Sequence, residues 1–166
     1  MLVIFMIIII ISNLILQGSV LPFFDFLVFL PNLGLISVVV ISIFEGKYYG
    51  AFFGLFMGLL QDALFADVIG VNALIFFLIG YALGFLKDSL NNENLILPII
   101  FTALGTIIYN AMYSLSMYFL SKDISLEIAF ERIFSIEILY NCILAFVFYK
   151  IFVKFFRTNS LNFGRR

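Results

Sequence analysis

The side chains best placed to do chemistry are a few carboxyl and amide groups inside otherwise apolar segments. Asp62 stands four residues after the last of three glycines, Gly50, Gly54 and Gly58, which are themselves four residues apart. Residues at this spacing lie on one face of a helix. The pattern therefore predicts a carboxylate at the end of a smooth glycine face, either as part of a functional site or as a polar group at a helix end.

The remaining residue types offer little for catalysis. The chain has no histidine and one cysteine, Cys142. Histidine is the commonest general base and a usual zinc ligand, and a lone cysteine forms no disulfide within the chain. The sequence also shows no nucleophile with a base and no phosphate-cradling loop. We therefore expect no enzyme activity, no metal site and no cofactor.

The composition indicates an integral membrane protein. Of the 166 residues, 64% are hydrophobic and only 11% are charged. Soluble domains average about 45–50% apolar and about 25% charged residues. A soluble fold of this size has too little interior to hide so much apolar surface. We therefore expect membrane lipid to surround the protein. The sequence has no basic stripe, so we expect no nucleic-acid partner.

Six segments approach the length of about 20 apolar residues that a membrane-spanning helix needs. The start of the second is ambiguous, because the sequence PNLG at 31–34 can delay it. The first lacks the charged leader and cleavage site of a signal peptide, so we expect it to stay in place. The sequence predicts an all-α integral membrane protein, a compact bundle of six transmembrane helices in a single domain over 1–166, with spans at about 2–21, 28–44, 48–66, 70–87, 95–120 and 130–156.

The distribution of basic residues predicts the orientation of this bundle. Lysine and arginine are enriched in the cytoplasmic loops of membrane proteins. With the N-terminus inside, the cytoplasmic side receives Lys47, Lys87 and the basic C-terminal tail, while the outer side receives only Lys122 and Arg132. We therefore expect both termini to be cytoplasmic.

In this topology most polar side chains within the spans gather in the outer half of the membrane. We expect two groups, a polar rim of Gln17, Asp62, Gly70 and Asn72, and an outer cavity of Asn110, Glu137 and Asn141. Asn72 has two interpretations, since it can cap the fourth helix or bond back to Asp62.

The glycine spacing returns in the fourth helix, at Gly80 and Gly84. Small residues four apart let helices approach closely in lipid, where apolar side chains gain little by meeting. Close packing between helices of this chain is the simpler interpretation of Gly50, Gly54, Gly58 and their partners. The alternative is a docking groove for a helix of another protein.

Three short motifs stand in order within residues 54–84. They read Gly54-x-x-x-Gly58-Leu-Leu-x-Asp62, Gly70-Val-Asn72-Ala-Leu74 and Gly80-Tyr81-x-x-Gly84. In these motifs the sequence resembles MreD, a family of bacterial rod shape-determining membrane proteins. Outside them the similarity is mainly in length and hydropathy.

The resemblance implies a non-enzymatic scaffold of the cell-elongation (rod) complex in the bacterial inner membrane. It implies MreC, a single-span protein with an outer domain, as the direct partner. The actin-like MreB, the polymerase RodA and a class B penicillin-binding transpeptidase are expected in the same complex, which supports lateral peptidoglycan synthesis and cell shape. We expect the polar rim to hold MreC, and Asp62→Ala to weaken assembly without unfolding the bundle.

A second family remains as an alternative. Small six-helix proteins of this shape are similar to the substrate-binding S components of energy-coupling-factor vitamin transporters, and the outer polar cluster would then be a ligand pocket. Against this, Asn13-x-x-x-Gln17 replaces the small-residue step by which the first helix of those components docks.

Overall fold

The computed structural model of the chain describes residues 2–23, 30–87, 96–120 and 135–160. Over these residues it is entirely helical, which confirms the all-α prediction for them. The α-helices are α1 (Leu2–Ile15), α2 (Leu33–Glu45), α3 (Lys47–Phe65), α4 (Val71–Gly84), α5 (Ile96–Phe119) and α7 (Glu137–Ser160). A π-helical turn at Leu16–Val20 and a 3-10 turn at Leu21–Phe23 extend α1.

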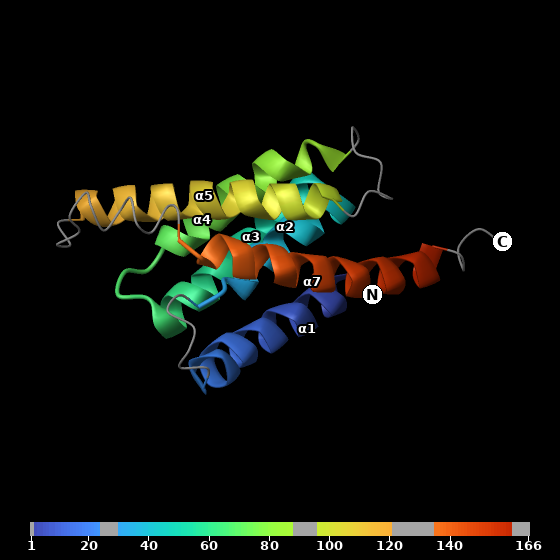
Figure 1. Cartoon of the computed structure of the whole chain (residues 1–166), viewed down its shortest axis with the longest axis horizontal. Coiled ribbons are helices and arrows are strands. Elements are labelled where there is room, and N and C mark those ends of the chain that lie inside the picture. Colours follow the sequence, from blue (N-terminus) through green and yellow to red (C-terminus); the bar gives the residue numbers. More distant parts are fainter. Residues whose placement is uncertain (1, 24–29, 88–95, 121–134, 161–166) are drawn as a thin grey trace.

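The helices run alternately in opposite directions along one bundle axis (Figure 1). In that view α1 begins on the right and α7 ends there, whereas α3 stops and α4 starts on the left. The left end, here called the α3–α4 end, therefore collects the last residues of α1, α3 and α5 and the first residues of α2, α4 and α7. It is the end that the sequence predicts to face outward.

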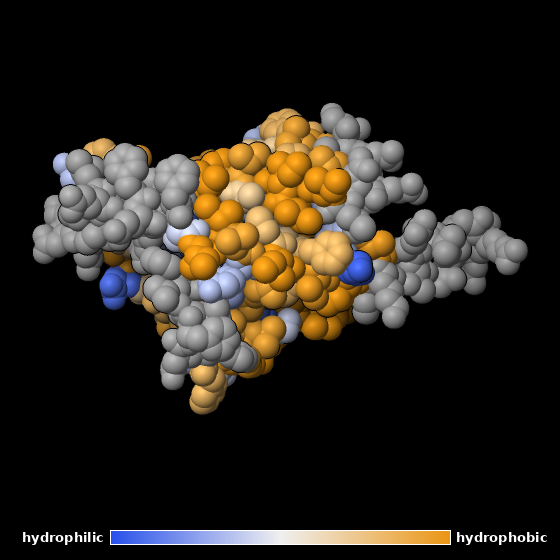
Figure 2. Space-filling model, in the orientation of Figure 1, coloured by the Kyte–Doolittle hydropathy of each residue, from blue (hydrophilic) through white to orange (hydrophobic). Residues whose placement is uncertain are grey.

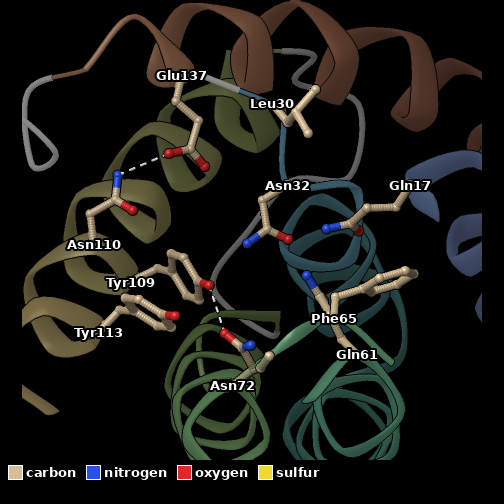
Figure 3. Close-up of a pocket in the computed structure, with 11 residues that line it drawn as sticks. Gln17, Leu30, Asn32, Gln61, Phe65, Asn72, Tyr109, Asn110, Tyr113 and Glu137 are labelled. Carbon is tan, nitrogen blue, oxygen red and sulfur yellow. Dashed lines mark hydrogen bonds between the residues drawn. The ribbon is translucent and has the colours of Figure 1, made fainter. Parts of the chain in front are cut away.

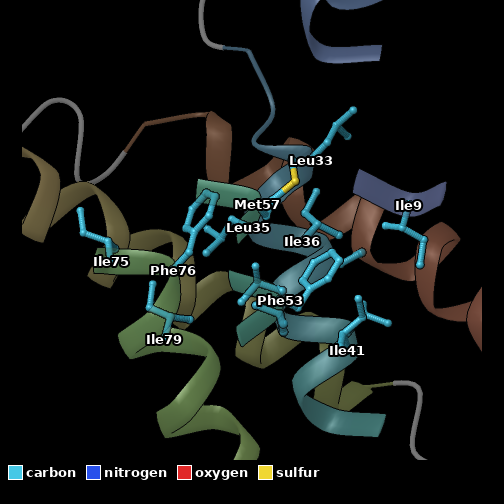
Figure 4. Packing of buried hydrophobic residues seen from close by; sticks show 14 of the residues in the cluster. Ile9, Leu33, Leu35, Ile36, Ile41, Phe53, Met57, Ile75, Phe76 and Ile79 are labelled. Carbon is cyan, nitrogen blue, oxygen red and sulfur yellow. The ribbon is translucent and has the colours of Figure 1, made fainter. Parts of the chain in front are cut away.

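The α2 helix forms the centre of the bundle. Every residue from Leu33 to Ile43 is buried, and α2 contacts α1, α3, α4, α5 and α7. A helix that is apolar on all sides is expected to be enclosed in this way. Figure 4 shows Phe53 and Met57 of α3 and Phe76 of α4 packed around Leu35 and Ile36 of α2.

Single glycines set the two tight connections in this part of the chain. Gly46 alone joins α2 to α3, with φ +88°. Its N–H donates to the Ser42 carbonyl at 2.9 Å and its carbonyl accepts from the Gly50 N–H at 2.9 Å. Gly70, with φ +102°, precedes α4. A positive φ is readily adopted by glycine, so both turns depend on this residue type.

Several helix bounds differ from the predicted ones. The second span was predicted at about 28–44, with PNLG able to delay its start, and the structure has the late start. The α2 helix begins at Leu33 because Asn32 caps it, its side chain accepting from the Leu35 N–H at 3.0 Å. The α4 helix ends at Gly84 and not at 87, since the Phe85 N–H bonds back only three residues, to Ala82.

The last helix also differs from its prediction. It starts at Glu137 and continues to Ser160, beyond the predicted 156, because no proline or glycine interrupts it before Gly164. The α3 and α5 helices lie within one residue of their predicted bounds. Residues 28–29, 95 and 130–134 of the predicted spans lie outside the described residues, as do Lys122 and Arg132.

Two helical segments of the described chain, Leu2–Phe23 and Ile96–Phe119, are long and apolar enough to cross a membrane. The α2 and α4 helices are apolar but shorter, at 13 and 14 residues. A crossing needs about 20 residues. Figure 2 shows apolar side chains over most of the described surface on one face, as expected for a protein surrounded by lipid.

The glycine face of α3 packs against α4, and these two helices make the most extensive contact in the described structure. A Cβ added at Gly54 would lie 2.5 Å from the Phe76 carbonyl oxygen, and one at Gly50 would lie 2.9 Å from that of Gly80. No side chain fits such gaps. Added Cβ atoms at Gly58, Gly80 and Gly84 would likewise meet the backbones of Ala73, Gly50 and Lys47. Close packing within the chain therefore accounts for these glycines. The α4 helix already occupies the face that a helix of another protein would need.

The close contact predicts the effect of one added methyl group. Overpacking costs about 1–3 kcal/mol, whereas alanine gains only about 0.5–1 kcal/mol over glycine inside a helix. We expect Gly54→Ala to lower the free energy of unfolding by about 1–2 kcal/mol, measured in detergent by circular dichroism.

Gly105 in α5 offers a matched control. Its added Cβ would lie 3.5 Å from a Val39 methyl and 3.9 Å from an Ile79 methyl, which are ordinary contact distances. Gly105→Ala should therefore be neutral or stabilising. Equal effects of the two alanines would contradict the packing role of Gly54.

Candidate functional site

The Asp62 carboxylate caps the first turn of α4. Its Oδ2 accepts from the backbone N–H groups of Gly70, at 2.8 Å, and Ala73, at 3.1 Å, and its Oδ1 accepts from the N–H of Asn72 at 3.2 Å. The first N–H groups of a helix lack partners within it, and the helix dipole favours a negative charge there. Asp62 is only 1% exposed. Its carboxylate therefore holds the start of α4, so we expect Asp62→Ala to lower stability in addition to the predicted loss of assembly.

The Asn72 side chain faces away from this cap. Its Oδ1 accepts from the Tyr109 hydroxyl at 2.6 Å, which ties α4 to α5. The Tyr109 ring also stacks with Tyr113, with ring centres 5.8 Å apart. Of the two interpretations of Asn72, neither describes its side chain: the bond to Asp62 comes from its backbone N–H, and the cap of α4 is Asp62.

A second carboxylate, Glu137, stands in the first turn of α7, where the dipole again favours it. Its Oε2 accepts from the Asn110 amide at 3.2 Å and its Oε1 from the Asn141 amide at 3.3 Å. Asn141 also donates to the Thr106 hydroxyl at 3.1 Å and accepts from the Asn32 N–H at 2.9 Å. The predicted outer group of Asn110, Glu137 and Asn141 is thus one hydrogen-bonded network joining α2, α5 and α7.

A partly open cavity of about 500 Å³ lies between these two networks at the α3–α4 end. Figure 3 shows around it side chains of the π-helical turn after α1, of the residues before α2, and of α3, α4, α5 and α7. We call it the polar cavity, and its lining is Gln17, Leu30, Asn32, Gln61, Phe65, Ala66, Asn72, Tyr109, Asn110, Tyr113 and Glu137.

The structure brings most of the predicted polar residues to this cavity. Gln17, Asn72, Asn110 and Glu137 line it, while Asp62 and Asn141 are buried beside it and hold lining residues in place. Gly70 lies at the start of α4, where its N–H meets Asp62.

The sequence analysis did not assign Gln61, Asn32, Tyr109 or Tyr113 to the cavity, although all four line it. Gln61 directly precedes Asp62 in the motif, and Asn32 lies in PNLG, so both had a signal: an amide side chain in an apolar segment. Among the described residues, no group of three or more metal-ligating side chains gathers in one place.

An apolar groove of about 550 Å³ lies between α1 and α3. We call it the α1–α3 groove. Its α3 wall includes Tyr49, Phe52 and Phe56, which are 49%, 58% and 57% exposed. Its full lining is Val3, Met6, Ile7, Ile10, Ile11, Tyr49, Phe52, Phe53, Phe56 and Leu60.

Comparison with protein families gives one result that bears on function. The model of the family described as rod shape-determining protein MreD matches residues 1–159. Comparisons with curated proteins and with solved structures gave no match.

The cap predicts that Asp62 contributes to stability. Asp62→Ala leaves three N–H groups at the start of α4 without their acceptor. Hydrogen bonds to charged groups and helix caps each contribute about 1–3 kcal/mol, so we expect the free energy of unfolding in detergent to fall by about 2 kcal/mol or more. Asp62→Asn keeps one acceptor oxygen, so its free energy of unfolding should lie between those of Asp62→Ala and the wild type.

Asp67, an exposed aspartate five residues later, is the matched control. Asp67→Ala should change stability by no more than about 0.5 kcal/mol. If both alanine variants unfold like the wild type, the capping role of Asp62 is wrong.

Proposed function

The chain belongs to the MreD family of rod shape-determining proteins, and from this premise we propose that it is a membrane scaffold that holds MreC in the cell-elongation complex. The family match covers 159 of 166 residues and implies a role in rod shape determination. It is a family of membrane proteins that determine shape, not a known enzyme family. Binding of MreC and support of peptidoglycan synthesis are the parts that we add.

We propose that all six described helices cross the bacterial inner membrane as a single domain, with both termini in the cytoplasm. The alternating helix directions support this, because α1 begins and α7 ends at the same end of the bundle. Lys47 starts α3 and Lys87 follows α4 at that end, as the enrichment of basic residues on the cytoplasmic side requires. Helices of 13–14 residues extend only about 20 Å, so flanking residues complete the crossings of α2 and α4.

The α1–α3 groove is the observation that carries the MreC proposal. The glycine face is covered by α4, so a partner helix needs another surface. In lipid, helices associate through close packing and not through the hydrophobic effect, and a concave apolar surface allows such packing. A membrane-spanning helix of MreC in this groove would contact Phe52 and Phe56. It would emerge from the groove beside Leu60, next to the polar cavity.

The polar rim then meets the segment of MreC that follows its span. Gln17 and Asn72 line the cavity, and Gly70 lies in the connection that Asp62 holds. We propose that MreB, RodA and a class B penicillin-binding transpeptidase join the same complex, with lipid on the remaining apolar surface. The family match lends no support to the vitamin-transporter alternative.

A cross-linked pull-down from native membranes tests the proposed function. Mild detergent and mass spectrometry should recover an MreC-like protein together with wall-synthesis enzymes. Recovery of a transmembrane coupling subunit with two ATPases, without MreC, would contradict the scaffold and identify a transporter component.

Site-specific photo-cross-linking tests the groove itself. A photoreactive side chain at Phe56 should capture MreC in cells several-fold more efficiently than the same group at Leu104, an exposed residue of α5 outside the groove. Equal capture at both positions, or capture only at Leu104, would place MreC elsewhere.

A further inference from the structure

Two glutamine side chains of the polar cavity carry buried oxygens without a hydrogen bond. Among the described residues, Oε1 of Gln17 and Oε1 of Gln61 have no donor. Gln61 is only 5% exposed, and its amide belongs to the cavity lining. Buried polar groups are nearly always paired with protein or with ordered water. The cavity therefore keeps amide side chains whose hydrogen-bonding capacity the protein leaves partly unused, which suits a polar ligand.

The other polar groups of the cavity are already fixed in position. Tyr109 holds the Asn72 oxygen, and Asn110 and Asn141 hold the two oxygens of Glu137. In Figure 3 the amide groups of Gln17, Asn32 and Gln61 lie on one side of the cavity, with the nitrogens of Gln17 and Gln61 toward Asn32. Groups that are held before binding lose little freedom on binding, which favours recognition.

The chemistry of the lining selects a neutral ligand. The described lining contains amides, phenols and one carboxyl group but no lysine or arginine. An anion would meet Glu137 without a compensating cation. Amides donate and accept hydrogen bonds, as sugar hydroxyl groups do. The stacked pair Tyr109 and Tyr113 adds aromatic surface to the lining, and the C–H groups of a sugar ring can pack on such surface.

We propose that the polar cavity binds a neutral sugar, either free or as the headgroup of a membrane glycolipid. Its volume of about 500 Å³ lies within the range of small-molecule sites, roughly 300–1,000 Å³. The α1–α3 groove has a different lining, whereas Gln17 and Asn72 belong both to this cavity and to the proposed polar rim, so sugar binding is measured on the chain without MreC. Water alone in the cavity is the competing outcome.

The test uses the purified full chain in lipid nanodiscs and equilibrium binding of labelled probes. The free probes are glucose and N-acetylglucosamine, the lipid probe is a glucosyl diacylglycerol, and glucose 6-phosphate is the charged analogue. We expect saturable binding of a free neutral sugar or of the glycolipid, and the arm that binds identifies the source. Glucose 6-phosphate should bind at least tenfold more weakly than glucose, a difference of about 1.4 kcal/mol.

Gln61→Leu separates a binding role from a structural one. It removes an unpaired buried amide, so the unfolding temperature should stay the same or rise, while affinity for the sugar falls at least tenfold. Tyr81→Phe, which removes a hydroxyl outside the cavity lining, should change neither.

Three results would overturn the proposal: no saturable binding of any neutral probe, binding that Gln61→Leu leaves unchanged, or preference for the phosphorylated sugar. Because the pull-down measures MreC and this assay measures sugar, a failure of one is distinguishable from a failure of the other.

Discussion

The contact between the Asp62 carboxylate and the first turn of α4 is the interaction on which the rest of the α3–α4 end depends. Three backbone N–H groups, from Gly70, Asn72 and Ala73, converge on one buried side chain. A lipid-embedded bundle has little water to satisfy such groups, and an unpaired one is costly. The carboxylate therefore fixes where α4 starts, and the glycine face of α3 fixes how closely α4 runs beside it.

A second buried carboxyl group, Glu137 at the start of α7, accepts from the side-chain amides of Asn110 and Asn141. Two buried carboxylates thus organise the same end of the bundle, and the space between their networks is the polar cavity. The α1–α3 groove leads along the outside of the bundle to the same place. In our proposal the scaffold presents a rigid outer end to MreC, while the cavity beside it receives a sugar.

The sequence predicted the glycine contact, which follows from spacing on one helix, and it left two interpretations of Asp62 open. The structure supports the polar group at a helix end, and the partner-binding role stays a prediction. The sequence placed Gln17, Asn72, Asn110 and Glu137 at one end, because alternating helices determine which ends meet. Partners across helices were not predictable: the Asn72–Tyr109 bond joins residues 37 positions apart, and the Asn32–Asn141 bond joins residues 109 apart. The late start of α2 depended on whether Asn32 would act as a cap.

The central claim is that this end of the protein is formed before any partner binds. Amide hydrogen exchange of the chain alone in nanodiscs, followed over residues 66–74 by mass spectrometry, tests it most directly. We predict slow exchange at Gly70, Asn72 and Ala73, whose N–H groups Asp62 holds. Exchange at the rate of an unstructured peptide, slowing only when MreC is added, would show that the partner builds this end and would contradict the account.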